Sequence, residues 1–285
     1  MKFSSVGRHI VIWIAIVVAL FPIAWMTSMA FKPPLEWTSA AGTVSWLPKE
    51  PTLANFEYIF TGKSSAYPSS TLMERTALWP ILSSLLISTV ATLIATIVGA
   101  LAAYGYSRHR FGTNLPFALL QLRLFPPLAV MIPVMIMWAY LNLIDTWWGL
   151  ALIYGIGTLP FGFWLMLTFL EDVPVELEEA AMIEGADPAR IFYRITLPLL
   201  KPAIATTALF VFILNWSDYI MALLLTRKAW VTLPVFMNDL NSAQTGQLYG
   251  AKAALGLIAI VPPLILGILI QKHLVRGLTF GALKQ

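Results

Sequence analysis

The chain has 285 residues, of which 59% are hydrophobic and only 11% are charged. Soluble domains carry about 25% charged residues and about 45–50% apolar ones, so this composition excludes a soluble globular protein and predicts an integral membrane protein. The net charge of +4 comes without a stripe of Lys and Arg, which argues against nucleic-acid binding. The chain has no cysteine, which excludes disulfides, thiolate metal sites and cysteine nucleophiles.

Six apolar segments are long enough to cross a membrane as helices, which takes about 20 residues each. They are residues 10–31, 78–104, 115–140, 149–170, 203–225 and 253–269. The consecutive prolines Pro126-Pro127 are expected to bend or break the third segment. The predicted fold class is therefore an all-α integral membrane protein with about six transmembrane helices, in which residues 1–285 form a single transmembrane domain.

Lysine and arginine in the short loops indicate the orientation of these segments. Basic residues precede the first segment and follow the second and the sixth, whereas the link around Asp145, between the third and fourth, has none. Both termini are therefore predicted to lie in the cytoplasm. The same reasoning makes residues 32–77 an external loop and residues 171–202 a cytoplasmic loop.

The loop of residues 171–202 holds seven of the 14 acidic residues of the chain. Its pattern predicts two short helices. The first stops at Gly185, since glycine is favoured just after the end of a helix. Asp187-Pro188 caps and begins the second, over residues 189–195, and Leu197-Pro198 is expected to end it. A compact pair of helices outside the membrane is a shape suited to docking on another protein.

The residues of this loop carry a family resemblance. Glu179-Ala180-Ala181, three residues, Gly185, nine residues and Ile195-Thr196-Leu197-Pro198 resemble the cytoplasmic motif of permeases in ABC-type, binding-protein-dependent importers. The resemblance covers nearly the whole chain and is closest to the carbohydrate branch, to subunits like the second maltose-system permease. Further segments that look like this branch are Phe31-Lys32-Pro33, Trp46-Leu47-Pro48, Pro51-Thr52-Leu53 with Asn55, Asn215-Trp216-Ser217-Asp218-Tyr219, and residues 277–284. Ser217 departs from the pattern, since relatives often have asparagine there.

The resemblance implies that the short helix after Gly185 is a coupling helix, which sits in a groove of a separate ATPase subunit. The residues assigned to this coupling are Glu179, Ala180, Ala181, Gly185, Ala186, Asp187, Pro188 and Arg190. The implied partners are two copies of the cytoplasmic ATPase, a second permease subunit, an external solute-binding protein and the lipid of a bacterial inner membrane. The implied solute is a sugar, a polyol or a related small molecule.

The chain lacks the phosphate-binding pattern G-x-x-x-x-G-K-[ST]. ATP hydrolysis is therefore expected on a partner chain, and this chain is expected to be a non-catalytic subunit without a cofactor or a metal site. Two other classes compete with this interpretation. A stand-alone secondary transporter would favour inverted repeats and ion ligands within the membrane, and a membrane enzyme would need a catalytic constellation that the sequence does not contain.

Four residues within the apolar segments are candidates for the translocation pathway: Arg123, Asn215, Trp216 and Asp218. Charged residues are costly in a membrane and usually face the interior of a bundle or a water-filled cavity. For Arg123 the alternative is a structural role, bonding the carbonyls freed near Pro126-Pro127 or an acid of the partner permease. For Asn215 and Asp218 the alternative is hydrogen bonding between helices.

Overall fold

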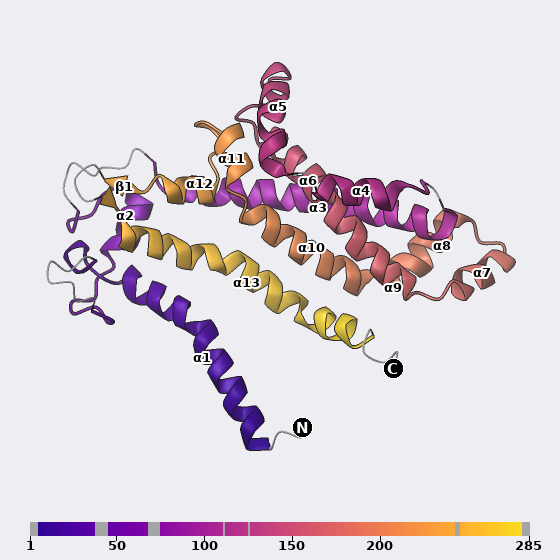
Figure 1. Ribbon diagram of the computed structural model, residues 1–285, viewed down its shortest axis with the longest axis horizontal. Coiled ribbons are helices and arrows are strands. Elements are labelled where there is room, and N and C mark those ends of the chain that lie inside the picture. The colour runs from indigo at the N-terminus through magenta and orange to yellow at the C-terminus, as the bar shows by residue number, and fades with distance from the viewer. Residues whose placement is uncertain are drawn as a thin grey trace. The chain divides into compact units, whose positions relative to one another are not determined.

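Helices make up most of the described part of the chain in the computed structural model (Figure 1). The structure describes residues 5–37, 45–67, 75–110, 112–124, 126–242 and 246–280. In chain order the elements are α1 (Ser5–Ala30), the 3-10 helix η1 (Pro34–Glu36), α2 (Ala54–Thr61), α3 (Leu78–His109), α4 (Leu115–Leu124), α5 (Pro127–Tyr140), α6 (Trp147–Glu171), α7 (Glu176–Ile183), α8 (Pro188–Ile191), the π-helix η3 (Phe192–Thr196), α9 (Leu197–Leu199), α10 (Lys201–Trp216), α11 (Ile220–Leu225), α12 (Leu233–Asn238), β1 (Asn241–Ser242), β2 (Gly246–Gln247) and α13 (Tyr249–Phe280).

Four helices in the described part of the chain are long and apolar enough to cross a membrane: α1, α3, α6 and α13. They correspond to the first, second, fourth and sixth predicted segments. The third and fifth predicted segments are present as pairs of shorter helices, α4 with α5 and α10 with α11. The prediction of an all-α integral membrane protein is confirmed, with two of its six segments broken.

The break in the third segment lies at the two prolines. Pro126 has an extended conformation (φ −62°, ψ 119°), and Pro127 is the first residue of α5. Proline is tolerated at this first position because its missing N–H would have no partner within the helix. The prediction that Pro126-Pro127 breaks the third helix is confirmed, and α5 points away from α4 in Figure 1.

The fifth segment, residues 203–225, is interrupted by residues 217–219 between α10 and α11. The hydroxyl of Ser217 donates to the carbonyl oxygen four residues earlier at 2.7 Å. The carboxylate of Asp218 accepts the backbone N–H three residues later at 3.1 Å. These side chains bond to backbone groups at the break, which is how a helix can be interrupted within an apolar segment. The prediction of one continuous helix carrying Asp218 is wrong at this point.

The contacts within the chain group it into two compact units. Unit 1 is Met1–Ile81 with Leu233–Val261, and unit 2 is Leu82–Thr232 with Pro262–Gln285. In unit 1 the side chain of Lys32 is fully buried, with its ammonium 4.7 Å from the ring centroid of Trp25 and bonded to a main-chain carbonyl. The amide of Asn55 donates to the carbonyl oxygen of Lys32 at 2.8 Å and accepts the hydroxyl of Tyr67 at 2.6 Å. Lys32 and Asn55, which belong to the segments of the family resemblance, are therefore packing residues of this unit.

In unit 2, α3 and α6 pack with their backbones in direct contact. A Cβ added to Gly162 would lie 3.0 Å from the carbonyl oxygen of Ala95, and one added to Gly99 would lie 2.9 Å from the backbone nitrogen of Phe163. Small residues allow such close approach between membrane helices. Toward the end of α6 the core consists of larger buried side chains, among them Phe163, Met166, Leu170 and Leu200. This core leads directly to the segment that contains α7, α8 and α9.

Asp145 holds the chain between α11 and α12 against the link between α5 and α6. Its carboxylate accepts four consecutive backbone N–H groups, those of residues 227–230, at 2.9–3.1 Å. Burial raises the pKa of Asp145, but these hydrogen bonds outweigh it and hold the pKa below its ordinary value of 3.8. The ionised carboxylate is therefore the form that stabilises this turn.

We expect Asp145→Asn to lower the thermal stability of the purified protein at neutral pH. An amide offers one acceptor oxygen in place of two, so some N–H groups lose their partner, at about 1–3 kcal/mol. Because the folded pKa is lowered, the carboxylate contributes stability above the ordinary pKa and loses it as the pH falls through the folded pKa. The difference in melting temperature between wild type and variant should therefore shrink below pH 3.8. Equal melting temperatures at neutral pH would contradict this account.

Candidate functional site

The first helix of the segment between α6 and α10 is α7, and it ends as the sequence predicts. Gly185 follows the helix with φ +84°, a left-handed conformation that glycine adopts without steric cost. Its N–H donates to the carbonyl oxygen of Met182 at 3.0 Å, and the N–H of Ala186 donates to that of Ala181 at 3.0 Å. These bonds satisfy the last carbonyls of α7, and the chain then turns into α8.

The start of α8 is also as predicted. The carboxylate of Asp187 accepts the backbone N–H of Arg190 at 3.0 Å, and Pro188 occupies the first turn. The hydrogen bond from the Arg190 N–H lowers the pKa of Asp187 below its ordinary value. A carboxylate at a helix N-terminus also interacts favourably with the helix dipole. The predicted cap at Asp187-Pro188 is confirmed.

The continuation of α8 differs from the prediction. The expected helix over residues 189–195 becomes the π-helix Phe192–Thr196, in which the N–H of Leu197 bonds to the carbonyl oxygen of Phe192. Leu197-Pro198 does not end the helical structure, because Pro198 lies in the first turn of α9, where a missing N–H is tolerated. The direction changes instead by 70° between the α8–α9 stretch and α10.

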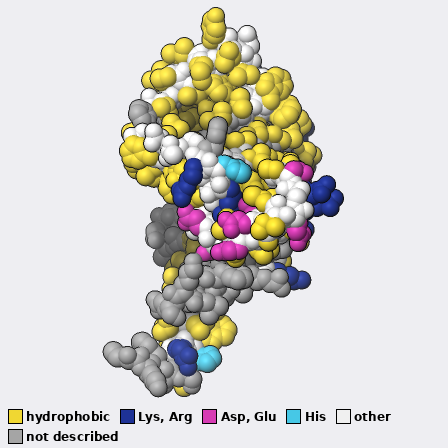
Figure 2. All heavy atoms as spheres, turned by 90° about the vertical axis from the view of Figure 1, so that its right-hand side faces the viewer, with side chains coloured by type: hydrophobic (Ala, Val, Ile, Leu, Met, Phe, Trp, Pro, Cys, Tyr) yellow, Lys and Arg dark blue, Asp and Glu magenta, His cyan; other side chains and the backbone are white. Residues whose placement is uncertain are grey.

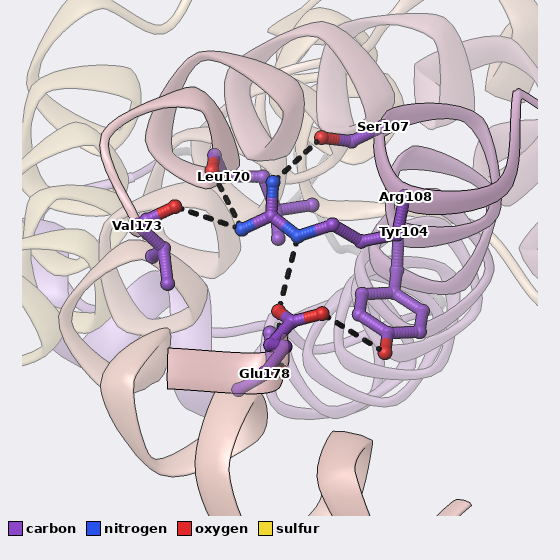
Figure 3. A network of polar contacts seen from close by, with 7 residues as sticks. Tyr104, Ser107, Arg108, Leu170, Val173 and Glu178 are labelled. Atoms are coloured by element: carbon purple, nitrogen blue, oxygen red, sulfur yellow. Dashed lines mark hydrogen bonds and ion pairs between the residues drawn. The ribbon is translucent and has the colours of Figure 1, made fainter. Parts of the chain in front are cut away.

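A buried ion pair fastens α7 to the end of α3 (Figure 3). The Nε of Arg108 lies 3.0 Å from Oε1 of Glu178, and the side chains are 10% and 1% exposed. The hydroxyl of Thr196, from η3, donates to the same carboxylate oxygen at 2.8 Å. The hydroxyl of Tyr104, one turn before Arg108 on α3, lies 3.4 Å from Oε2. The carboxylate of Glu178 thus has partners from two other elements.

The guanidinium of Arg108 is equally well bonded. Its Nη2 donates to the carbonyl oxygens of Val173 at 2.9 Å and Leu170 at 3.3 Å, and its Nη1 donates to the hydroxyl of Ser107 at 3.2 Å. Leu170 is in the last turn of α6 and Val173 lies just beyond it, and Figure 3 shows both beside the guanidinium. A buried charge is tolerated when it is paired and hydrogen-bonded. The cluster, which we call the α3–α7 joint (Tyr104, Arg108, Glu178 and Thr196), meets that condition.

The sequence interpretation missed Glu178. It is one of three acids in the first turn of α7, with Glu176 and Glu179, and all three favour the same end of the helix dipole. The helical period alone does not distinguish them, because α7 has no apolar stripe long enough to define its buried face. The informative signal is the pairing of Glu178 with Arg108, 70 residues earlier, and only the folded chain reveals it.

The exposed surface of α7, which we call its outer face, carries apolar side chains as well as charges. Leu177 is 47% exposed, Met182 is 48% exposed and Ile183 is 88% exposed. Figure 2 shows Asp, Glu, Lys and Arg side chains gathered on the part of unit 2 that contains α7 and α8. The predicted coupling residues share this surface: Glu179, Ala180, Gly185, Asp187, Pro188 and Arg190 are exposed, and Ala181 and Ala186 are partly buried.

The candidates for the translocation pathway lie apart from this segment. Asn215 is buried near the end of α10, with its amide 3.5 Å from the hydroxyl of Thr92 on α3. Trp216 is buried and stacks on Phe212, with ring centroids 5.7 Å apart. Asp218 accepts the hydroxyl of Tyr154 on α6 at 3.0 Å. Asn215 and Asp218 thus bond to α3 and α6, whereas Trp216 packs within α10. A role of the three residues in translocation stays a prediction.

Arg123 lies in α4, but its side chain is outside the part that the structure describes, so both interpretations of this residue stay open. Among the described residues, no group of three or more His, Asp or Glu is placed to hold a metal ion.

The fold and this segment together define a multi-pass helical membrane protein. The chain belongs to the family of binding-protein-dependent transport system inner membrane components, to which its residues 95–280 match. The trehalose transport system permease protein SugB of Mycobacterium tuberculosis is 34% identical, with 93% of each chain covered. The galactooligosaccharides transport system permease protein GanQ of Bacillus subtilis is 30% identical, over 94% of this chain and 91% of that protein. The predicted resemblance to permeases of carbohydrate ABC importers is confirmed.

A solved structure supports the fold. The crystal structure of a bacterial ABC transporter involved in the import of the acidic polysaccharide alginate contains a chain that superposes with a TM-score of 0.72. The two chains are 22% identical, and the match covers 95% of this chain and 99% of that one. The arrangement of helices is therefore that of an ABC importer permease.

Proposed function

We propose that this chain is the transmembrane permease subunit of an ATP-driven importer and that the segment of α7, Gly185 and α8 binds a separate ATPase subunit. The observation that carries this proposal is the contrast between the buried and the exposed side chains of α7. Glu178 is fixed to the membrane helices by the α3–α7 joint, whereas Leu177, Met182 and Ile183, on different sides of the helix, are exposed. A firmly held helix with exposed apolar side chains is suited to transmit force to or from a bound partner.

The alternative for this segment is a solvated loop whose charges keep it out of the lipid. Such a loop would not need a buried, fully bonded ion pair, which is costly to remove from water. An exposed isoleucine also gives a solvated loop no stability. The side chain of Ile183 is 88% exposed, and its full burial against a partner would contribute about 1.5–3 kcal/mol. Docking of the outer face on another protein accounts for both features.

The assembly that follows from this proposal has several parts. Two ATPase subunits bind on the cytoplasmic side, a second permease completes the translocation pathway, and a solute-binding protein delivers the solute from outside. The chain then lies in the cytoplasmic (inner) membrane of a bacterium as a single permease domain with both termini in the cytoplasm. Labelling of a single cysteine at the exposed Thr113 from the inner side alone would test this orientation.

The relatives support a proposal for the solute class. Their names specify trehalose, galactooligosaccharides and, for the Thermococcus litoralis relative that is 30% identical, trehalose and maltose. We propose a sugar, a polyol or a related solute for this chain, with this subunit forming half of the pathway. Arg123, Asn215, Trp216 and Asp218 are the residues we propose for the pathway.

The test of the proposed function is the energy source of uptake. Membrane vesicles that contain the complex should accumulate solute only with ATP inside and with the solute-binding protein outside, and an ionophore that collapses ion gradients should leave the initial rate unchanged. The stand-alone secondary transporter predicts the opposite on both counts. The family weighs against it, because its members are components of binding-protein-dependent systems.

A further inference from the structure

The attachment of α7 to the rest of unit 2 depends on one side chain of that helix. Among the eight residues of α7 only Glu178 is buried. The carboxylate of Glu178 contacts Arg108 on α3 and Thr196 on η3. This carboxylate is therefore a direct route by which a movement of α7 reaches α3 and η3.

The guanidinium of Arg108 extends this connection to a third element. While Nε bonds to Glu178, Nη2 bonds to the carbonyl oxygens of Leu170 and Val173, at the end of α6 and just beyond it. The planar fork of an arginine fixes the directions of all these bonds at once. Arg108 thus holds the last turn of α3, the end of α6 and the first turn of α7 in one geometry (Figure 3).

The other end of α7 is built differently. Gly185 has a left-handed conformation, and a Cβ added to it would meet no atom within 4 Å. The turn after α7 is therefore open, whereas the start of α7 is held by a buried cluster of directional bonds. Directional bonds fix the relative orientation of the elements that they join.

We propose that Arg108 is a positioning residue for transport: through Glu178 it transmits the movement of α7 to α3 and α6, so that ATP hydrolysis by the bound ATPase drives the change of conformation in the membrane. This inference rests on the proposed function, since it requires an ATPase that binds the outer face of α7. The inference adds to that function the two residues, Glu178 and Arg108, through which the movement of α7 and the energy of ATPase binding reach the membrane helices.

The absence of cysteine from the chain allows a test by replacing the ion pair with a covalent link. The double variant Arg108→Cys with Glu178→Cys carries the only two thiols of the subunit, and a short bis-methanethiosulfonate reagent can join them reversibly. The complex is purified through a tag on this chain and placed in proteoliposomes with its solute-binding protein. The quantity measured is the number of ATP molecules hydrolysed for each solute molecule taken up. The single variant Arg108→Cys, treated with the same reagent, is the matched control.

Without the link, we expect the ATP consumed per solute to rise several-fold above the wild-type value, because the bonded pair that joins α7 to α3 is gone. The yield of complex should stay near that of wild type, because the outer face of α7 is unchanged. The link should bring the ratio back toward the wild-type value, a reductant should raise it again, and the single variant should not respond. A rescue by a link of different chemistry distinguishes a mechanical joint from a group needed only for its charge.

Three results would overturn the proposal. The first is a wild-type ratio of ATP to solute in the unlinked double variant. The second is a ratio of ATP to solute that stays raised although mass spectrometry shows that every pair of thiols is linked. The third is loss of assembly in both the double variant and Glu178→Gln, which keeps the shape and removes the charge, since the pair would then serve folding alone. A wild-type complex without ATP-dependent uptake would instead reject the proposed function, and this inference with it.

Discussion

Gly185→Pro is expected to abolish ATP-dependent uptake while leaving the protein inserted in the membrane. Proline fixes φ near −65°, whereas residue 185 has φ +84°, so the chain after α7 must take another direction. The substitution also removes the N–H that bonds to the carbonyl oxygen of Met182. The misfit costs about 3 kcal/mol or more locally, and α8 leaves the position that docking requires. Uptake by vesicles and co-purification of the ATPase subunit with the tagged chain are the measurements.

Gly185→Asn is the matched control for this substitution. Asparagine tolerates the left-handed conformation better than other residues with a side chain, and an added Cβ at this position meets no atom within 4 Å. We expect this variant to keep most of the wild-type uptake. Normal transport by Gly185→Pro, or equal loss in both variants, would show that the turn geometry at residue 185 is not what coupling depends on.

The features that the sequence predicted well are those with local causes. Four continuous apolar segments form helices, because an apolar segment of this length can satisfy its backbone hydrogen bonds within a membrane only as a helix. The end of α7 and the start of α8 were predictable because Gly185 and Asp187 act on backbone groups within a few residues of themselves. The break at Pro126-Pro127 likewise follows from the proline ring itself.

The features that the sequence did not predict depend on residues far apart in the chain. Glu178 cannot be told from Glu176 and Glu179 until α7 docks against α3 and meets Arg108. The π-helix η3 carries Thr196, whose hydroxyl bonds to Glu178, so its geometry also belongs to this docking. π-helical turns are rare and occur often at functional sites, and the sequence of η3 offers no local signal for one.

The break at residues 217–219 is a mixed case. Ser217 and Asp218 can bond to the backbone of their own segment, which is a local cause, but the same residues are also compatible with a continuous helix. The bond from the hydroxyl of Tyr154 to Asp218 comes from α6. This tertiary contact favours the interrupted form, and it explains why a segment of suitable length and hydropathy is not one helix.

Ile183→Asp is expected to separate the ATPase subunit from the permease. Ile183 is the last residue of α7 and is 88% exposed in this chain, so the proposed complex is where it becomes buried. The substitution removes a central apolar side chain and buries a charge in its place. The expected loss of binding free energy is about 3 kcal/mol or more, which weakens binding by about 100-fold. We expect the amount of ATPase that co-purifies with the tagged chain to fall by a comparable factor at limiting concentration, and uptake to fall with it.

Leu35→Asp provides the matched comparison, because Leu35 is 93% exposed and lies in η1 of unit 1, far along the chain from α7. The chemical change is nearly the same, so any general effect of a new surface aspartate on expression or insertion should appear in both variants. Only Ile183→Asp should reduce ATPase binding, because only Ile183 lies on the outer face of α7. Full ATPase binding by Ile183→Asp would mean that the exposed end of α7 is not the docking surface, and the apolar face of this segment would need another partner.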